Sequence, residues 1–164
     1  MAPASLPELP EPTRIRLGYL LRSGDRQVWV QVARRADGAE TGAIGVNGPA
    51  DLAIDEFVYG VPPDDAAFML DHLCAAGQVQ KVRCVLAVDG HVFTAAVYGG
   101  HLEGLATAEA DLGPSGGAVA LPPWVVADVT GDRRFTDTAL SQLSTRAAAA
   151  LVREVISVAL RTGS

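Results

Sequence analysis

The sequence predicts an α+β domain built on an antiparallel β-sheet or barrel, with one helix on the sheet and a long C-terminal helix. Two observations predict this fold class. Between residues 14 and 112, strand-like stretches alternate with turn signals about every ten residues. Two other stretches instead space their apolar side chains by three and four residues, which is typical of helices.

Seven strands are expected, joined by residues that favour tight chain reversal. The stretches 23–26 and 47–49 form two of the turns. The Asp89-Gly90 pair suits a two-residue hairpin, because both positions tolerate positive φ. The expected strands are 14–22, 27–34, 41–46, 51–61, 79–88, 91–98 and 105–112.

Two helices complete the predicted domain. The first is expected over 63–76, because Pro63 and two aspartates suit a helix N-terminus and Gly77 ends it. The second is expected over 138–161, where the apolar side chains form one stripe. This stripe either closes the domain or pairs with a second copy. Its members are Leu140, Leu143, Ala147, Leu151, Val155 and Val158.

Length and composition predict one domain at 13–164, preceded by a flexible, proline-rich lead-in at 1–12. The net charge of −6 argues against nucleic-acid and anionic-membrane binding. No apolar run reaches the roughly 20 residues of a spanning helix, and the N-terminus lacks a signal peptide, so we expect a cytoplasmic protein. Twelve arginines against one lysine are typical of a GC-rich genome, and we expect a bacterial protein with two reduced cysteines.

Several common active sites are not supported by the sequence. The three histidines are spaced nineteen and ten residues apart, which does not favour a zinc site. There is no Gly-x-Ser-x-Gly elbow, and neither cysteine has the setting of a nucleophile. The GPSGG stretch at 113–117 lacks the Lys-Ser/Thr ending of a phosphate-binding loop.

Charged residues with strand spacing remain as candidates. Lys81 and Arg83 are two residues apart, as are Glu109 and Asp111, so each pair points to one face of its strand. Cations and carboxylates on one face would suit a phosphate chain and its divalent metal. The alternative is a solvated outer face, which commonly carries such residues.

Several motifs give the chain a resemblance to a known family. They are TRIRLGYL at 13–20, EFVYGVP at 56–62, QKVRCVLAVDGHVF at 80–93, LEGLATAEADL at 102–112 and LPPWVVADVTGDRRFTDTALS at 121–141. In order and spacing they resemble the CYTH family of triphosphate tunnel metalloenzymes, which includes class IV adenylyl cyclases, thiamine triphosphatases and inorganic triphosphatases. The resemblance implies a triphosphate-tunnel barrel whose inward residues hold a triphosphate and one or two divalent metals.

The resemblance assigns roles to individual positions. The family's K-x-R strand falls on Lys81 and Arg83, which implies phosphate binding. The metal-binding carboxylates would be Glu56, Glu109 and Asp111, with Mg²⁺ or Mn²⁺ as the cofactor if the protein is active. We add Arg133 as a third phosphate-binding candidate, because its segment could reach a barrel mouth.

Most other family positions are lost. The arginine pair falls on Trp29 and Gln31, and a lysine falls on Gly45. Two further carboxylate positions are Thr94 and Ala96, and the E-x-E-x-K strand that should precede residue 13 is missing from the lead-in. The remaining lost positions are Ile54, Val58 and Gly60.

The energetic effect of these losses is large. A charge-assisted hydrogen bond contributes roughly 1.5–3 kcal/mol, so the missing cations remove on the order of 6–12 kcal/mol. Micromolar binding is worth only about 8 kcal/mol. We therefore assign no catalytic residue, and we expect efficient triphosphate hydrolysis to be lost, which leaves a non-catalytic or weakly active binder.

The expected inward face is half apolar, and two interpretations remain open. It is either filled, with its opposite charges paired, or open as a small-molecule pocket. Arg14 and Arg16 are expected at the surface, although on a strand they could instead replace the missing arginine pair. The inward set is Trp29, Glu56, Val58, Lys81, Arg83, Val85, Ala87, Ala96, Glu109 and Asp111.

Three functional hypotheses follow. The first is a pseudoenzyme that binds a small phosphorylated or anionic ligand, or another protein. The second is a divergent metal-dependent hydrolase, either an inorganic triphosphatase or adenylyl-cyclase-like. The third is a structural module that dimerises through the helix at 138–161, since a barrel without its first strand exposes two edges and favours a homodimer.

Overall fold

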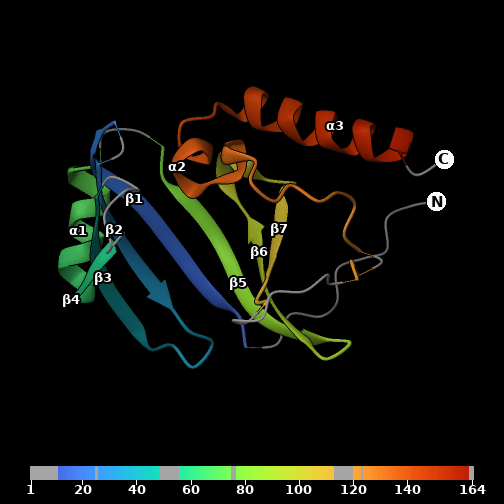
Figure 1. Cartoon of the computed structure of the whole chain (residues 1–164). Coiled ribbons are helices and arrows are strands. Elements are labelled where there is room, and N and C mark those ends of the chain that lie inside the picture. The colour runs from blue at the N-terminus through green and yellow to red at the C-terminus, as the bar shows by residue number, and fades with distance from the viewer. Residues whose placement is uncertain are drawn as a thin grey trace.

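A seven-stranded antiparallel sheet forms the body of the protein. The computed structural model describes residues 11–24, 26–48, 56–74, 77–112, 120–122 and 124–162, with side chains through 157. The sheet is curved, and its strand order is β4-β3-β2-β1-β5-β6-β7 (Figure 1). The strands are β1 (Thr13–Ser23), β2 (Arg26–Arg34), β3 (Glu40–Asn47), β4 (Glu56–Val61), β5 (Val79–Val88), β6 (His91–Tyr98) and β7 (Ala106–Ala110).

The predicted strands and the predicted hairpin are present. β4 is described from Glu56 onward, and the expected residues 51–55 lie outside the described part of the chain. Asp89 has a φ of 49° and Gly90 a φ of 81°, so the β5–β6 turn has the two positive φ angles that its sequence predicts.

The antiparallel sheet is not closed into a barrel, and it has two free ends, as expected for a barrel fold without its first strand. β4 and β7 are the two ends of the strand order, and in the described part of the chain β4 pairs with β3 and β7 with β6. Closure would require these edges to pair with each other or through a further strand. The first strand of the family would precede residue 13, and the sequence predicts that it is missing. Residues 1–10 of this stretch lie outside the described part of the chain.

The helix α1 (Pro63–His72) packs on one face of β1–β3, which we call the outer face. Pro63 and two aspartates begin it, as expected, and the side chains of Ala66 and Leu70 are fully buried against the sheet. The helix approaches β1 at Gly18, where a Cβ atom would lie only 2.8 Å from the Cys74 Sγ atom. Glycine at this position therefore allows the helix to pack closely.

The predicted C-terminal helix is divided into two helices, which corrects the expectation of one helix over 138–161. They are α2 (Asp137–Leu140) and α3 (Thr145–Thr162). The Ser144 hydroxyl accepts a hydrogen bond from the Ala147 backbone N–H at 3.2 Å, which starts a new helix. Apolar spacing continues across the break, so the stripe alone did not reveal it.

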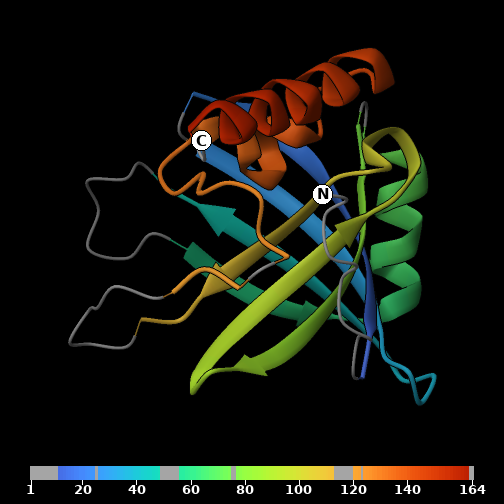
Figure 2. The same cartoon turned by 90° about the vertical axis from the view of Figure 1, so that its right-hand side faces the viewer.

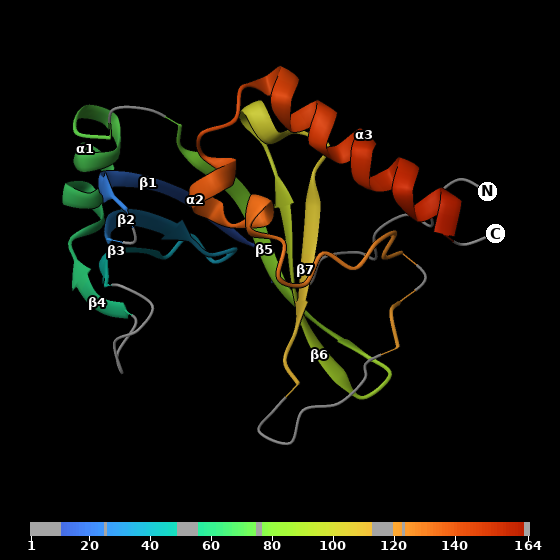
Figure 3. The same ribbon diagram turned by 45° about the horizontal axis from the view of Figure 1, so that its top comes forward.

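The helices α2 and α3 cover the inner face, which is the face opposite α1. Figure 3 shows α2 in the angle between the two halves of the sheet, and Figure 2 shows α3 lying across one end. Leu140 and Leu151 of the predicted stripe are buried in the molecule's own core, and Leu143 packs against it. Ala147, also predicted for the stripe, is exposed, and its neighbour Ala148 is buried instead. The buried residues around them in this core include Val79, Tyr98, Leu102 and Leu105. These contacts support closure of the domain as the role of the stripe.

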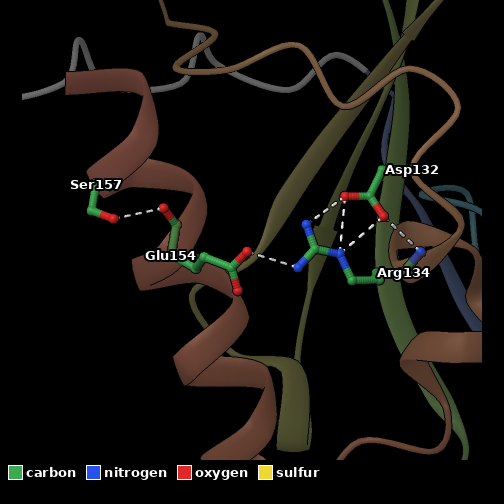
Figure 4. Close-up of polar contacts among 4 residues, drawn as sticks. All are labelled: Asp132, Arg134, Glu154 and Ser157. Atoms are coloured by element: carbon green, nitrogen blue, oxygen red, sulfur yellow. Dashed lines mark hydrogen bonds and ion pairs between the residues drawn. The ribbon is translucent and has the colours of Figure 1, made fainter. Parts of the chain in front are cut away.

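Two further contacts complete the fold. Trp124 packs on the outer face of β5–β7, with its ring centre 6.0 Å from that of Phe93. Arg134, in the short helix η2 (Arg133–Phe135), binds Glu154 of α3 at 2.9 Å and Asp132 at 2.7 Å (Figure 4). The other short helix is η1 (Gly100–Leu102). Both cysteines are free thiols, as expected. Among the described helices, none combines the length and apolarity needed to span a membrane.

Candidate functional site on the inner face

Strand register places the predicted inward residues on the inner face. Lys81 lies opposite Ile15 on one side and Tyr98 on the other, and Arg83 lies opposite Ala96. Residues directly opposite each other in antiparallel strands share a face. The same rule brings Trp29, Glu56, Val58, Val85, Ala87, Ala96 and Glu109 to the inner face. Asp111 follows the end of β7 and is exposed.

Lys81 is already neutralised by a carboxylate within the protein. Its Nζ atom lies 2.5 Å from the Asp137 Oδ2 atom, and the two side chains are 14% and 24% exposed. The Tyr98 hydroxyl donates to the other Asp137 oxygen at 3.3 Å, and the Lys81 ammonium lies 5.6 Å from the Tyr98 ring centre. Burial, and then the Asp137 carboxylate, raise the pKa of Tyr98, so this hydroxyl remains a donor.

A second group of polar contacts holds α2 against the sheet. The Thr138 hydroxyl lies 2.9 Å from the Tyr19 hydroxyl and 2.8 Å from the Gln27 side-chain oxygen. Arg22 donates to the Ser141 hydroxyl at 2.8 Å. Burial raises the pKa of Tyr19, which keeps this phenol neutral. These contacts position Asp137 above Lys81.

Trp29 stands at a position where the resemblance implies an arginine, and it covers Gly45, where the resemblance implies a lysine. A Cβ atom at Gly45 would lie 2.0 Å from the indole Cε2 atom. The indole N–H donates to Glu56 Oε1 at 2.9 Å, and the Asn47 amide donates to the same oxygen at 3.1 Å. The one family carboxylate retained on β4 is therefore engaged by neutral donors.

Arg83 is the accessible cation of the inner face. It is exposed, and it forms no hydrogen bond or ion pair within the described part of the chain. Glu109 of β7, which lies opposite Thr94 of β6, is also exposed. Among the described residues, the inner face therefore presents the unpaired guanidinium of Arg83, the paired ammonium of Lys81 and the exposed carboxylate of Glu109.

The predicted metal-binding residues do not form a cluster. Glu56 is on β4 and Glu109 on β7, at opposite ends of the strand order. Among the described residues, no group of three His, Cys, Asp or Glu side chains could hold a metal ion. A resident metal held by protein ligands alone does not fit this donor set.

Arg133 lies on η2, whereas Lys81 and Arg83 lie on β5. It is exposed on η2 and lines a hollow of about 290 Å³ beside α2. The other lining residues are Gly24, Gln27, Gly48, Thr136, Thr138 and Ala139. Gln27 and Thr138, whose hydrogen bond holds α2 against the sheet, also line this hollow. Arg133 therefore lies near the contacts that position α2.

Arg14 and Arg16 lie on the outer face and do not replace the missing arginine pair. Both alternate with Ile15, which is on the inner face opposite Lys81. Arg16 binds Asp71 of α1 at 2.5 Å. The expectation of surface positions is confirmed.

Sequence reasoning missed Asp137 as the partner of Lys81. The two residues are 56 positions apart, and an aspartate at the start of a helix is ordinarily explained by the helix dipole. No spacing or local pattern indicated that this carboxylate would reach the sheet.

Comparisons with known proteins agree with the fold and with the motifs. No family model matches the chain. A curated inorganic triphosphatase of Acetivibrio thermocellus is 28% identical over 126 residues, which span 76% of this chain and 78% of that protein. The crystal structure of the hypothetical protein NE1496 matches with a TM-score of 0.66 at 22% identity, covering 86% of this chain and 93% of the other.

Proposed function

Because the chain is a divergent relative of the CYTH proteins, we propose that it binds a small phosphorylated anion on the inner face and has lost efficient hydrolysis. The favoured ligand is a triphosphate or a similar chain of phosphates. The relative named inorganic triphosphatase supports this ligand class. Arg83, Lys81 and, at the rim, Arg133 would contact its oxygens.

The observation that carries the proposal is the unequal state of the two β5 cations. Arg83 is exposed, while the Lys81 ammonium is bound by Asp137 at 2.5 Å. A guanidinium binds phosphate oxygens through two parallel hydrogen bonds, so Arg83 alone supports anion binding. A phosphate at Lys81 must compete with the Asp137 carboxylate, which limits affinity there.

The same arrangement weakens the case for hydrolysis. Phosphoryl transfer depends almost entirely on positioning and charge stabilisation. Trp29 stands where the family has an arginine, and its indole holds Glu56. These substitutions remove positive charge and occupy a carboxylate that would otherwise face the phosphates.

Metal binding would need help from the ligand itself. Mg²⁺ often uses one or two carboxylates together with substrate phosphates and water. Glu109 and Asp111 are the residues that would contribute, and the metal would neutralise phosphate charge. The protein's own part would be to bind and orient the anion through Arg83.

A second candidate function is metal-dependent triphosphate hydrolysis. The name of the curated relative favours it, as does the placement of Arg83 and Glu109 on one face of the sheet. This candidate requires the Lys81–Asp137 pair to open in the complex. An adenylyl-cyclase-like reaction has no separate observation in its favour.

The test is a calorimetric titration with inorganic tripolyphosphate, with and without Mg²⁺, combined with a phosphate-release assay. We expect binding that Arg83→Ala weakens at least tenfold, because a charged hydrogen bond is worth roughly 1.5–3 kcal/mol. Arg153→Ala is the matched control, since Arg153 is exposed on α3. We expect no phosphate release with Mg²⁺ or Mn²⁺.

Two results would decide against the proposal. Phosphate release that disappears in Lys81→Ala would establish the second candidate. If the folded protein shows no tripolyphosphate binding that depends on inner-face residues, both candidates are ruled out.

A further inference from the structure

A hollow bordered by arginines lies at the end of the sheet away from α2. Figure 1 shows the β2–β3 turn and the start of β1 together at the bottom, with α2 at the top. The hollow measures about 360 Å³ and is lined by Pro12, Arg14, Arg34, Arg35, Ala36 and Gly38. It is separate from the inner-face site, because Arg14 points to the outer face.

Two of these arginines stand directly opposite each other across the β1–β2 ladder. Arg14 and Arg34 are paired in the register, so their side chains lie on one face as nearest neighbours. Like charges in this position repel and destabilise the sheet. Arg35 adds a third guanidinium at the same place.

The acidic residues nearby neutralise this charge only in part. Arg34 lies 3.8 Å from Glu40, and Arg35 lies 3.4 Å from Asp37, both longer than the 2.7–2.9 Å or so of a strong charged hydrogen bond. Arg14 has no ion pair or hydrogen bond to the described residues.

The neighbouring Arg16, in contrast, is fully neutralised by a close ion pair. Arg16 is on the same face of the same strand and contacts Asp71 at 2.5 Å. The protein as a whole has a net charge of −6, so the excess of positive charge at Arg14 and Arg34 is confined to this part of the surface.

The turn that carries the arginines is held in place by its own backbone. The Arg35 N–H donates to the Ala39 carbonyl at 2.9 Å, and the Gly38 N–H donates to the Arg35 carbonyl at 3.0 Å. The Ala39 N–H donates to an Asp37 side-chain oxygen at 3.0 Å. Gly38 has a φ of 87°, which suits glycine. A turn fixed in this way orders Arg34 and Arg35 before any ligand arrives.

We propose that Arg14, Arg34 and Arg35 form a second anion site, on the outer face, which binds a polyvalent oxyanion such as an inorganic oligophosphate. A polyvalent anion removes the repulsion between Arg14 and Arg34 and is bound by several guanidinium donors at once. The site does not depend on the proposed inner-face function.

The experiment counts tripolyphosphate sites by calorimetry on the full chain and on charge-matched double variants. We expect two sites in the unmodified protein and one in Arg14→Gln/Arg34→Gln. The control is Arg146→Gln/Arg153→Gln, which removes two exposed arginines of α3 and should retain both sites. The Arg83→Ala variant should retain the outer site with less than a twofold change in its affinity.

A thermal measurement separates a binding role from a merely structural one. Without anion and at low salt, Arg14→Gln/Arg34→Gln should melt no lower than the unmodified protein, because repulsion has been removed. With tripolyphosphate, its melting temperature should rise less than that of the unmodified protein.

The outcomes are distinct for the two sites. The outer-site proposal is overturned if the double arginine variant binds as many tripolyphosphate ions as the control, or if the patch binds anionic vesicles and no tripolyphosphate. A single site that is lost in Arg14→Gln/Arg34→Gln and unaffected by Arg83→Ala would support the outer site and reject the inner one.

Discussion

At the scale of single residues, Trp29 and Gly45 form one packed pair, at two positions where the resemblance implies cations. The indole lies over the glycine, and neither a lysine nor any other side chain at position 45 would fit beneath it. The indole N–H then binds Glu56 at 2.9 Å. This part of the inner face is therefore neutral and packed where the resemblance implies charge, which is why we propose binding and no efficient catalysis.

Gly45→Ala should displace the indole, because the new Cβ atom would lie 2.0 Å from it. Overpacking of this kind costs about 1–3 kcal/mol. The measurements are denaturant unfolding and Trp29 fluorescence in a Trp124→Phe background. Gly60→Ala is the control, since nothing lies within 4 Å of its added Cβ. Equal stability and equal spectra for the two variants would show that the Trp29–Gly45 packing is not maintained in solution.

The face of each inner residue could be predicted from strand spacing, but its partner could not. Alternation placed Lys81, Arg83 and Glu109 on one face correctly, because strands have a period of two. The pairing of Lys81 with Asp137 depends on where α2 rests, which is a tertiary contact between residues 56 positions apart.

At the scale of elements, the break between α2 and α3 shows how local pattern and capping compete. The apolar stripe runs through both helices, yet the Ser144 hydroxyl caps a new helix and fixes a change of direction. A capping residue in a continuous apolar pattern was the available signal. The strands were easier to predict because turns and alternation agreed along most of the sheet.

Arg134 joins η2 to α3 through Glu154 (Figure 4), so Arg134→Ala should loosen the middle of α3. We expect faster amide hydrogen exchange around Glu154, since one tether of this helix is lost. The control is Arg146→Ala, which removes an exposed arginine of the same helix. Unchanged exchange in Arg134→Ala would mean that apolar packing alone holds α3.

The contact between Arg134 and Asp132 leads to a prediction about stability in acid. Hydrogen bonds from Arg134 hold the pKa of Asp132 below its usual range. A lowered pKa in the folded state stabilises the protein above the unfolded value of about 3.9 and stops doing so as the pH falls through the folded value. The melting-temperature advantage over Asp132→Asn should therefore shrink below about pH 4. The control is Glu103→Gln, which alters an exposed carboxylate, and its melting-temperature difference from the unmodified protein should change less with pH. If the unmodified protein melts above Asp132→Asn by the same margin from pH 7 to 2, the prediction is contradicted.

At the scale of the whole molecule, the sheet is open where the family resemblance implied a barrel. Local sequence specified seven strands and their order of appearance, while closure depends on register and on which edges meet. The edge strand β4 exposes Phe57 and Tyr59, at 45% and 59%. A homodimer through such edges stays a prediction.

Leu151→Ala should test whether the α3 stripe is core or interface. Leu151 is 8% exposed in the cluster with Leu102 and Leu140, so its truncation should cost about 2–5 kcal/mol of unfolding free energy. Ile156→Ala, at a 41% exposed position, should cost less. The molecular mass in solution should not change. A change in mass with little loss of stability would instead support the dimerising module.

The most direct test of phosphate binding on the inner face is to remove the carboxylate that occupies Lys81. Asp137→Asn keeps the shape of the side chain and frees the ammonium, so tripolyphosphate should bind at least tenfold more tightly at the inner site than in the unmodified protein. Adding Lys81→Ala should abolish this gain, and Asp132→Asn, with the same change in net charge, should leave inner-site affinity unchanged. If a folded Asp137→Asn protein binds no more tightly than the unmodified one, Lys81 is a structural cation, and the claim that Asp137 limits phosphate binding on the inner face is contradicted.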